Sequence, residues 1–202
     1  MVSPNSRSQK RGFYDKAYAL HPKALTRSSL YPPVVFTLQI TLGFTIAWLL
    51  IEGAIAQFII VTLFFGLSFA YLLRDERRPI LFDLVFALAA LLAAIGYTSG
   101  FLESVTYYDK VTHTFMTFSV SLAFFFLFYA GSVPRRRAIS LATSVFTLGF
   151  TVGALWEVFE WGTGIGGGGL SDTITDLMVD GGGALAAALV ALVVRERGER
   201  LT

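Results

Sequence analysis

The sequence predicts an all-α fold, a polytopic membrane bundle of about six transmembrane helices. Of its 202 residues, 54% are hydrophobic and only 15% are charged, which is too apolar for a water-soluble domain of this size. The mean hydropathy is +0.64. The charges are also segregated, because short clusters such as residues 74–78 and 135–137 separate long uncharged runs. This alternation is typical of membrane spans and the loops between them.

Several apolar runs are long enough to cross a hydrocarbon core of about 30 Å, which takes about 20 helical residues. Prolines stand just before three of the runs, where a missing backbone N–H does no harm. Glu52 and Gly53 leave almost no loop between the first two runs, which predicts a tight helical hairpin. The runs are residues 34–51, 54–73, 80–98, 111–130, 138–161 and 173–194.

The basic residues predict how the chain is oriented and divided. All 16 lysines and arginines except Lys110 lie in the two tails or in the loops at 74–78 and 135–137. Short loops rich in these residues stay on the cytoplasmic side, so both termini are expected in the cytoplasm. Residues 1–33 are then a basic cytoplasmic tail, 34–194 a six-helix transmembrane domain, and 195–202 a short cytoplasmic tail. The first tail has no apolar core, so it is neither a signal peptide nor a span.

Composition also excludes several functions. The chain has no cysteine, which removes disulfides, thiolate metal sites and cysteine nucleophiles. Any metal must therefore take oxygen or imidazole ligands. The net charge of +2 comes from basic clusters beside apolar runs, where anionic lipid head groups are the expected partner. We do not expect nucleic acid to bind.

Ionisable side chains gather at the outer ends of the last three predicted spans, on the face opposite the arginines. Inside a span such side chains are costly unless they are paired or ligated, so each is a functional candidate. A spacing of three or four residues puts the members of each group on one face of their helix. They are Asp109 and His113 of the fourth span, Glu157 and Glu160 of the fifth, and Asp172, Asp176 and Asp180 of the sixth.

The expected depths of these side chains predict a cup-shaped metal site. At a rise of about 1.5 Å per residue, one side chain from each span lies about one turn inside the outer boundary. These three are the expected catalytic residues: His113, Glu157 and Asp176. Asp109, Glu160 and Asp172 form a second layer nearer the outer water, and Asp180 lies deepest. All seven are candidate ligands for Mg²⁺, Mn²⁺ or Zn²⁺.

Several of these residues also have a structural interpretation. Asp172 suits the positive end of a helix dipole, and Asp109 can form an interface ion pair with Lys110. Glu160 can face the outer water. Asp180 precedes a run of glycines that permits close helix packing, and its carboxylate can pair with a neighbour.

Glycines elsewhere predict packing and linkage rather than ligand binding. Gly149 and Gly153 in the fifth span are a small-xxx-small pair, which is typical of tight helix contact. Residues 162–169 between the last two spans read as a flexible linker. The run 165–169 lacks the lysine and the serine or threonine of a phosphate-binding loop.

The last half of the chain, from about residue 108 onward, carries motifs of a known family. Residues 109–113 (DKVTH), 153–161 (GALWEVFEW) and 172–178 (DTITDLM) resemble the YjdF-type family of uncharacterised bacterial inner-membrane proteins. They are more distantly similar to VanZ-like proteins, which have Asn where Asp180 stands here. The resemblance implies a multi-pass protein of the bacterial inner membrane. It also implies a link to the cell envelope, and the family supplies no settled reaction.

Three functions fit these residues. A metal-assisted envelope enzyme would act on a lipid or lipid-linked substrate at the outer leaflet, with Glu157 activating water. A cation- or proton-coupled transporter would use the stacked acids of the last span. A non-catalytic scaffold would only pair its acids internally. The acids outnumber their possible positive partners, Lys110 and His113, so a divalent cation or a shared proton is expected to neutralise them.

Overall fold

The computed structural model describes residues 31–69, 80–105, 107–129, 137–164 and 168–199. Residues 1–30 of the predicted basic tail, and the loop arginines at 74–78 and 135–136, lie outside the described residues. Every regular element in the described part of the chain is a helix, which confirms the predicted all-α fold.

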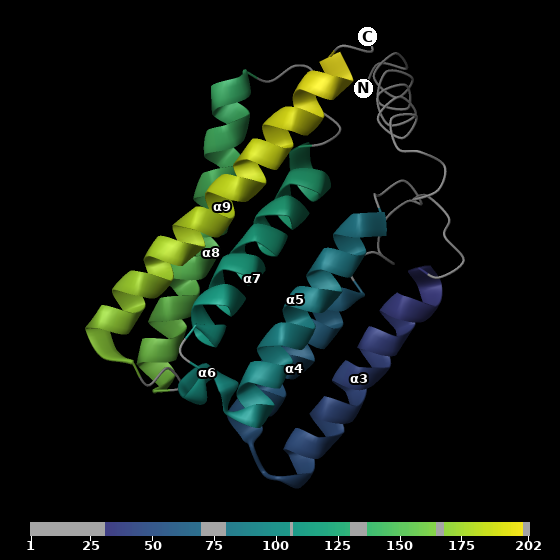
Figure 1. The fold of residues 1–202 in the computed structure, drawn as a ribbon, viewed down its shortest axis with the longest axis vertical. Helices are drawn as coiled ribbons and strands as arrows, with labels where there is room; N and C mark the ends of the chain where they lie inside the picture. Colours follow the sequence, from purple (N-terminus) through teal and green to yellow (C-terminus); the bar gives the residue numbers. More distant parts are fainter. Residues whose placement is uncertain (1–30, 70–79, 106, 130–136, 165–167, 200–202) are drawn as a thin grey trace, which may run out of the picture.

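A helix lies in the described part of each predicted span, and neighbouring long helices run in alternating directions (Figure 1). The turn from Glu52 to Ala54 joins the first two helices tightly, as expected, with the Ala54 amide donating to the Leu49 carbonyl at 3.0 Å. The helices are α3 (Tyr31–Ile51), α4 (Ile55–Ser68), α5 (Ile80–Ser99), the short α6 (Phe101–Ser104), α7 (Tyr108–Phe124) with a π-helical continuation η2 (Phe125–Tyr129), α8 (Ala138–Thr163) and α9 (Gly169–Glu199).

Some boundaries differ from those expected from the apolar runs. Helix α9 begins at Gly169, four residues before the predicted 173, because the polar residues of its first turn form backbone hydrogen bonds like any others. It also continues through Glu199, so residues 195–199 of the predicted short tail are helical. Helix α6, in the loop before α7, had no apolar run to reveal it.

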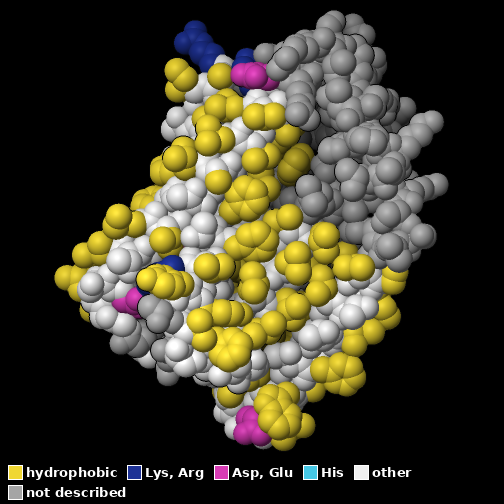
Figure 2. Space-filling view, viewed as in Figure 1, with side chains coloured by type: hydrophobic (Ala, Val, Ile, Leu, Met, Phe, Trp, Pro, Cys, Tyr) yellow, Lys and Arg dark blue, Asp and Glu magenta, His cyan; other side chains and the backbone are white. Residues whose placement is uncertain are grey.

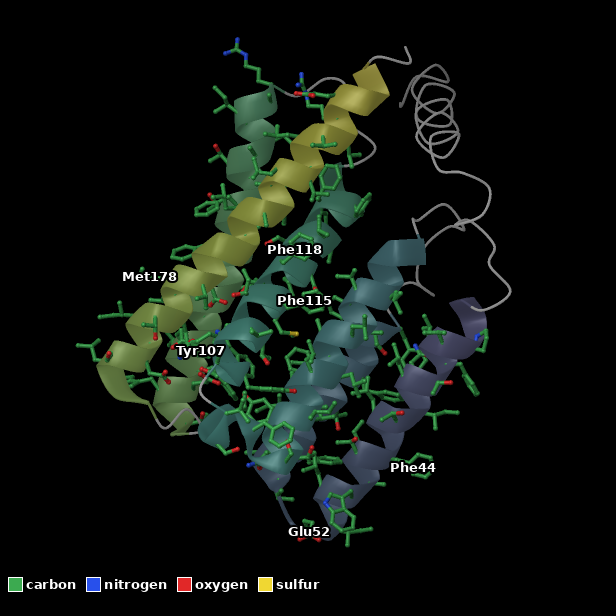
Figure 3. All side chains as sticks on the ribbon, viewed as in Figure 1. Phe44, Glu52, Tyr107, Phe115, Phe118 and Met178 are labelled. Carbon is green, nitrogen blue, oxygen red and sulfur yellow. The ribbon has the colours of Figure 1, made fainter. Side chains whose placement is uncertain are left out.

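The composition of the helices supports a membrane bundle. Among the described residues, three stretches are long and apolar enough to cross a membrane, judged by length and composition: Pro33–Ile51, Ala138–Thr163 and Gly169–Glu196. Large hydrophobic side chains point outward from them, including Phe44, Trp161 and Met178. Figure 2 shows hydrophobic side chains over most of the visible described surface, with charged ones toward its edges. Figure 3 shows Met178 projecting outward from α9. These side chains suit lipid contact rather than water.

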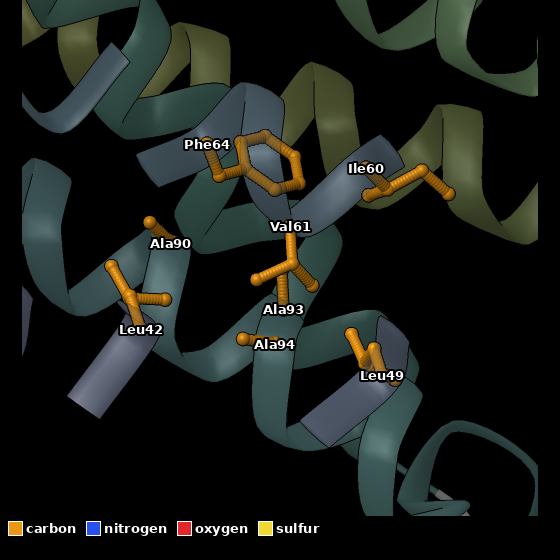
Figure 4. Packing of buried hydrophobic residues seen from close by; sticks show 8 residues of the cluster. All are labelled: Leu42, Leu49, Ile60, Val61, Phe64, Ala90, Ala93 and Ala94. Atoms are coloured by element: carbon orange, nitrogen blue, oxygen red, sulfur yellow. The ribbon is translucent and has the colours of Figure 1, made fainter. Parts of the chain in front are cut away.

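The first three helices form a bundle with a core of its own. Helices α3, α4 and α5 pack against one another. Buried leucines, alanines, Ile60, Val61 and Phe64 fill the space between them (Figure 4). The alanines of α5 let the helix axes approach closely. Trp156 of α8 packs against the edge of this core, which links it to the second half of the chain.

Helices α7, α8 and α9 are mutual neighbours, as the sequence predicted. Their apolar core includes Phe125, Leu141 and Val145, all fully buried. Helix α5 packs against α7 and so joins the two bundles. The polar residues of the predicted site lie at the other end of α7, α8 and α9 from this core.

Candidate functional site

The site lies where α7 begins, α8 ends and α9 begins. At about 1.5 Å per residue, His113 is about 8 Å from the start of α7 and Glu157 about 9 Å from the end of α8. Asp176 is about 10 Å along α9 from Gly169. These three ends are at the same end of the bundle, near Tyr107 in Figure 3. The matched depths predicted from the sequence therefore hold in the fold.

The imidazole of His113 lies among carboxylates from all three helices. Its Nδ1 is 3.6 Å from Glu157 Oε1 and 3.4 Å from Asp180 Oδ1. Its Nε2 is 3.7 Å from Asp109 Oδ1. The side chains of His113, Glu157 and Asp180 are 7%, 5% and 1% exposed, so this part of the cluster is shielded from solvent.

Lys110 holds the second part of the cluster together. Its ammonium donates to Asp109 Oδ2 and to Asp176 Oδ2, each at 2.9 Å, and also to Asp172 Oδ1. Asp176 is buried, whereas Asp172 in the first turn of α9 is partly exposed. The expected pairing of Asp109 with Lys110 is present, and the two other aspartates join it.

Asp180 is fixed from two sides. Thr117 of α7 donates a hydrogen bond of 2.6 Å to Asp180 Oδ1. On α8, Gly153 faces the same carboxylate so closely that a Cβ there would overlap Asp180 Oδ2 and lie 2.7 Å from Cγ. Gly149 similarly faces Ser121 and Ala184. The tight helix contact predicted for this glycine pair is confirmed, and one of its effects is to make room for the deepest carboxylate.

Glu160 lies at the edge of the cluster. Its Oε1 accepts a hydrogen bond of 3.2 Å from the hydroxyl of Tyr97 on α5. The sequence did not reveal Tyr97, because a single tyrosine near the end of an apolar run is also what an interfacial aromatic looks like. Glu160 belongs to neither of the two groups of side chains that could share a metal ion, described next.

In the part of the chain that the structure describes, two groups of three side chains have ligand atoms close enough to share a metal ion. One is Asp109, His113 and Asp176, and the other is His113, Glu157 and Asp180, with the ligand atoms of each group within 4.8 Å of one another. His113 belongs to both. The mixture of carboxylate oxygen and imidazole nitrogen suits a borderline or hard divalent cation.

Two buried carboxylate oxygens, Glu157 Oε1 and Asp176 Oδ1, accept no hydrogen bond from any described residue, and the second of them is 2.8 Å from the ammonium of Lys110. Buried polar atoms are normally paired, because leaving one unpaired costs about 1–3 kcal/mol. Glu157 Oε1 faces His113 Nδ1.

Most of the side chains grouped from the sequence therefore lie together, and their arrangement differs from the expected one in one detail. The structure brings six of the seven candidates into one cluster of contacts, with Glu160 beside it. The sequence placed Asp176 at the level of His113 and Asp180 below both. In the fold, Asp180 directly contacts the His113 ring, while Asp176 turns toward Lys110. The reason is the rotation of α9, which spacing along one helix does not reveal.

One turn below Asp180 the buried hydroxyl of Ser121 still lies between the helices, and beyond it the space becomes apolar. Leu122, Phe125, Leu141 and Val145 pack there with the alanines of α9. The polar cluster thus opens toward one end of the bundle, and hydrophobic side chains close it on the other side.

Comparison with known proteins finds one family. A family model described as "Predicted membrane protein (DUF2238)" matches residues 34–197, a range that includes every residue of the cluster. No curated protein and no solved structure matches the chain.

Proposed function

This chain belongs to the DUF2238 family of predicted membrane proteins, and we propose that it is a metal-assisted enzyme acting on a lipid or lipid-linked substrate. In this proposal it is a multi-pass protein of the bacterial inner membrane, which the resemblance of its motifs to YjdF-type proteins supports. Both termini face the cytoplasm, and the acidic cluster faces outward.

The observation that carries the proposal is the buried, unpaired Oε1 of Glu157 beside the imidazole of His113. The group of His113, Glu157 and Asp180 has ligand atoms within 4.8 Å of one another, which is close enough for all three to bind one ion. A divalent cation bound by these three atoms would give the orphaned oxygen a partner. It would also balance the two negative charges of Glu157 and Asp180, with His113 neutral.

The position of Lys110 makes the group of His113, Glu157 and Asp180 the better candidate for the cation site. In the group of Asp109, His113 and Asp176, the ammonium already contacts both carboxylates. Glu157 and Asp180 contact no lysine or arginine among the described residues, and the single ring of His113 faces both of these carboxylates. We therefore assign the cation to His113, Glu157 and Asp180.

The chemistry that follows is hydrolysis or transfer at a polar head group. The bound cation would polarise an ester or phosphoryl oxygen of the substrate. Glu157 would hold the cation through Oε1, which leaves its second carboxylate oxygen to accept a proton from a water molecule. Because Lys110 is already bound by three carboxylates, a phosphate would be held through the cation rather than by a free basic side chain. Membrane lipids are the expected partners.

Metal analysis and thermal unfolding of the purified protein test the site. We expect a chelator to lower the melting temperature in detergent and Mn²⁺ to restore it, since a ligand that binds only the folded state stabilises it. The shift should be about 5–10 °C at saturating metal. His113→Ala and Asp180→Asn should abolish it. Glu160→Gln is the matched control and should keep it, because Glu160 is outside both groups of ligands.

Activity is then measured by incubating the protein in vesicles of bacterial lipid extract, with Mn²⁺ or with chelator, and following the lipids by mass spectrometry. Metal-dependent conversion of one lipid class, lost in Glu157→Gln, is the expected result. A wild-type protein that carries no metal and ignores the chelator would rule the metal enzyme out.

A cation- or proton-coupled carrier is the second candidate, and the depth of Asp180 favours it. This carboxylate is completely buried, about 16 Å along α9, which is deeper than a head group needs. The apolar core around Phe125, Leu141 and Val145 argues against the carrier, because it interrupts a polar path between α7, α8 and α9. Flux of Mn²⁺ or protons into sealed vesicles, abolished by Asp180→Asn, would favour the carrier.

A further inference from the structure

Lys110 has more acceptors around it than an ordinary ion pair requires. An ammonium has three N–H donors. They are directed to Asp109 Oδ2, Asp172 Oδ1 and Asp176 Oδ2. A fourth oxygen, Asp176 Oδ1, lies 2.8 Å from the same nitrogen and accepts no hydrogen bond from any described residue.

The geometry at Asp176 is that of a carboxylate on a cation. Both oxygens of Asp176 lie within 2.9 Å of Lys110 Nζ, so both face the positive charge. The side chain of Asp176 is 2% exposed. One N–H group forms a directional hydrogen bond with a single oxygen, whereas a spherical ion attracts both oxygens of a carboxylate equally. Oxygen atoms from three carboxylates around one positive centre are also what a hard divalent cation takes.

We propose that Lys110 is a tethered cation that fills the second cation position of a two-cation site, and so limits the site to one metal ion. The proposal rests on the proposed function for the first ion, at His113, Glu157 and Asp180. Asp109 and Asp176 belong to a group of side chains that could hold a metal ion and are also the carboxylates that Lys110 contacts. The ammonium therefore occupies the space that a second ion would need.

The ligands of the two positions can be kept apart. His113 Nδ1 faces Glu157 and Asp180, which belong to the first position. With Nδ1 on the first ion, the neutral ring carries its proton on Nε2, which faces Asp109. A second ion would then take oxygen atoms of Asp109, Asp172 and Asp176. Oxygen ligands alone favour Mn²⁺ or Mg²⁺ over softer metals.

The test is the number of Mn²⁺ ions bound by Lys110→Met, which keeps the length of the side chain and removes its charge. Lys110→Arg is the matched control, because it keeps a positive charge at the same place. Stoichiometry is measured by titration calorimetry and by metal analysis of protein in detergent. Electron paramagnetic resonance then tests whether two ions are neighbours, since adjacent Mn²⁺ ions broaden each other's signal.

We expect one ion in the wild type and in Lys110→Arg, and two coupled ions in Lys110→Met. One ion in Lys110→Met would overturn the tethered-cation proposal and leave the proposed metal site intact. No ion in the wild type but one in Lys110→Met would overturn the metal enzyme and support the role of Lys110. If Lys110→Met folds only when Mn²⁺ is present, that dependence supports the proposal. If it fails to fold even with Mn²⁺, the double variant Lys110→Met/Asp172→Asn is measured, and binding no more ions than the wild type overturns it.

Discussion

The two ring nitrogens of His113 face different carboxylates, and this sets the orientation of the imidazole in the site. Nδ1 faces Glu157 and Asp180, while Asp109 lies on the Nε2 side at 3.7 Å, which is longer than a hydrogen bond. Metal-bound histidines generally direct their other nitrogen to a carboxylate, which fixes the tautomer and the ring orientation. Asp109 is in the place of that orienting carboxylate. Its role would then be to hold the ring, in addition to pairing with Lys110.

Thr117 offers a way to perturb the site without removing a ligand. Its hydroxyl donates to Asp180 Oδ1 at 2.6 Å, so Thr117→Val removes one hydrogen bond and little volume. We expect Mn²⁺ affinity to fall about 10- to 100-fold, the usual effect of losing a group that orients a ligand. Calorimetric titration measures it.

Thr112→Val is the control for this change, because the Thr112 hydroxyl bonds to the Tyr108 carbonyl of its own helix. It should leave affinity unchanged. Equal losses in the two variants would mean that the hydroxyl of Thr117 does not act through Asp180.

At the scale of the helices, the site depends on how closely α9 approaches α7 and α8. Gly183 of α9 faces the Thr114 carbonyl of α7, and Gly153 of α8 faces Asp180 of α9. Such contacts bring backbones together where a side chain would hold them apart. The glycines next to Asp180 and in α8 thus permit acids on three helices to reach one imidazole.

Gly153→Ala should damage the site through Asp180. The added methyl would overlap this carboxylate and push it away from His113. We expect the stabilisation by Mn²⁺ to be lost, and the protein to be destabilised by about 1–3 kcal/mol, as in other overpacked interiors. Gly162→Ala, on the same helix and with open space around it, is the control and should behave as wild type. A normal response to Mn²⁺ in Gly153→Ala would separate this contact from the cation site.

Neighbouring glycines of α9 allow a second comparison. A methyl on Gly183 would meet the backbone of Thr114, which cannot rotate away, whereas Gly182 has nothing within 4 Å. Gly183→Ala should therefore lower thermal stability, by about 1–3 kcal/mol. Gly182→Ala should keep or raise it, because alanine favours helix by about 1 kcal/mol over glycine. The melting temperatures of the two variants in detergent measure this difference. Equal stability of the two variants would contradict the close contact of α7 and α9.

The sequence predicted the helices and the members of the cluster for a physical reason. A span needs a fixed length of apolar residues, and a spacing of four fixes one face of a helix, so both are visible in one dimension. The rotation of α9 about its axis cannot be read from residue spacing. For this reason the sequence did not predict the partners of Asp176 and Asp180. The contacts of Lys110 with Asp172 and Asp176, and that of Tyr97 with Glu160, join residues more than sixty positions apart. Nothing local in the sequence marks such pairs.

At the scale of the whole molecule, the two ends of the bundle differ in chemistry. Arg137 directly precedes α8 and Arg195 lies near the end of α9, so both are at the end where the chain leaves the last helix. The acidic cluster lies at the other end, where α9 begins. With the apolar core between them, the molecule has one charged face on each side of a hydrophobic layer. This polarity fits a membrane protein with a site on one side only.

The orientation follows from that polarity and can be tested in intact cells. Because lysines and arginines in short loops are retained in the cytoplasm, the end with Arg137 should face inward and the linker between α8 and α9 outward. The chain has no cysteine, so a single one can be introduced without a background. A cysteine in the segment 166–169 should react with a membrane-impermeant thiol reagent, and one at Arg136 should react only after the cells are permeabilised. The Arg136 variant is also the control for reagent entry. The reverse pattern would turn the acidic cluster toward the cytoplasm, and a substrate in the outer leaflet could then no longer reach it.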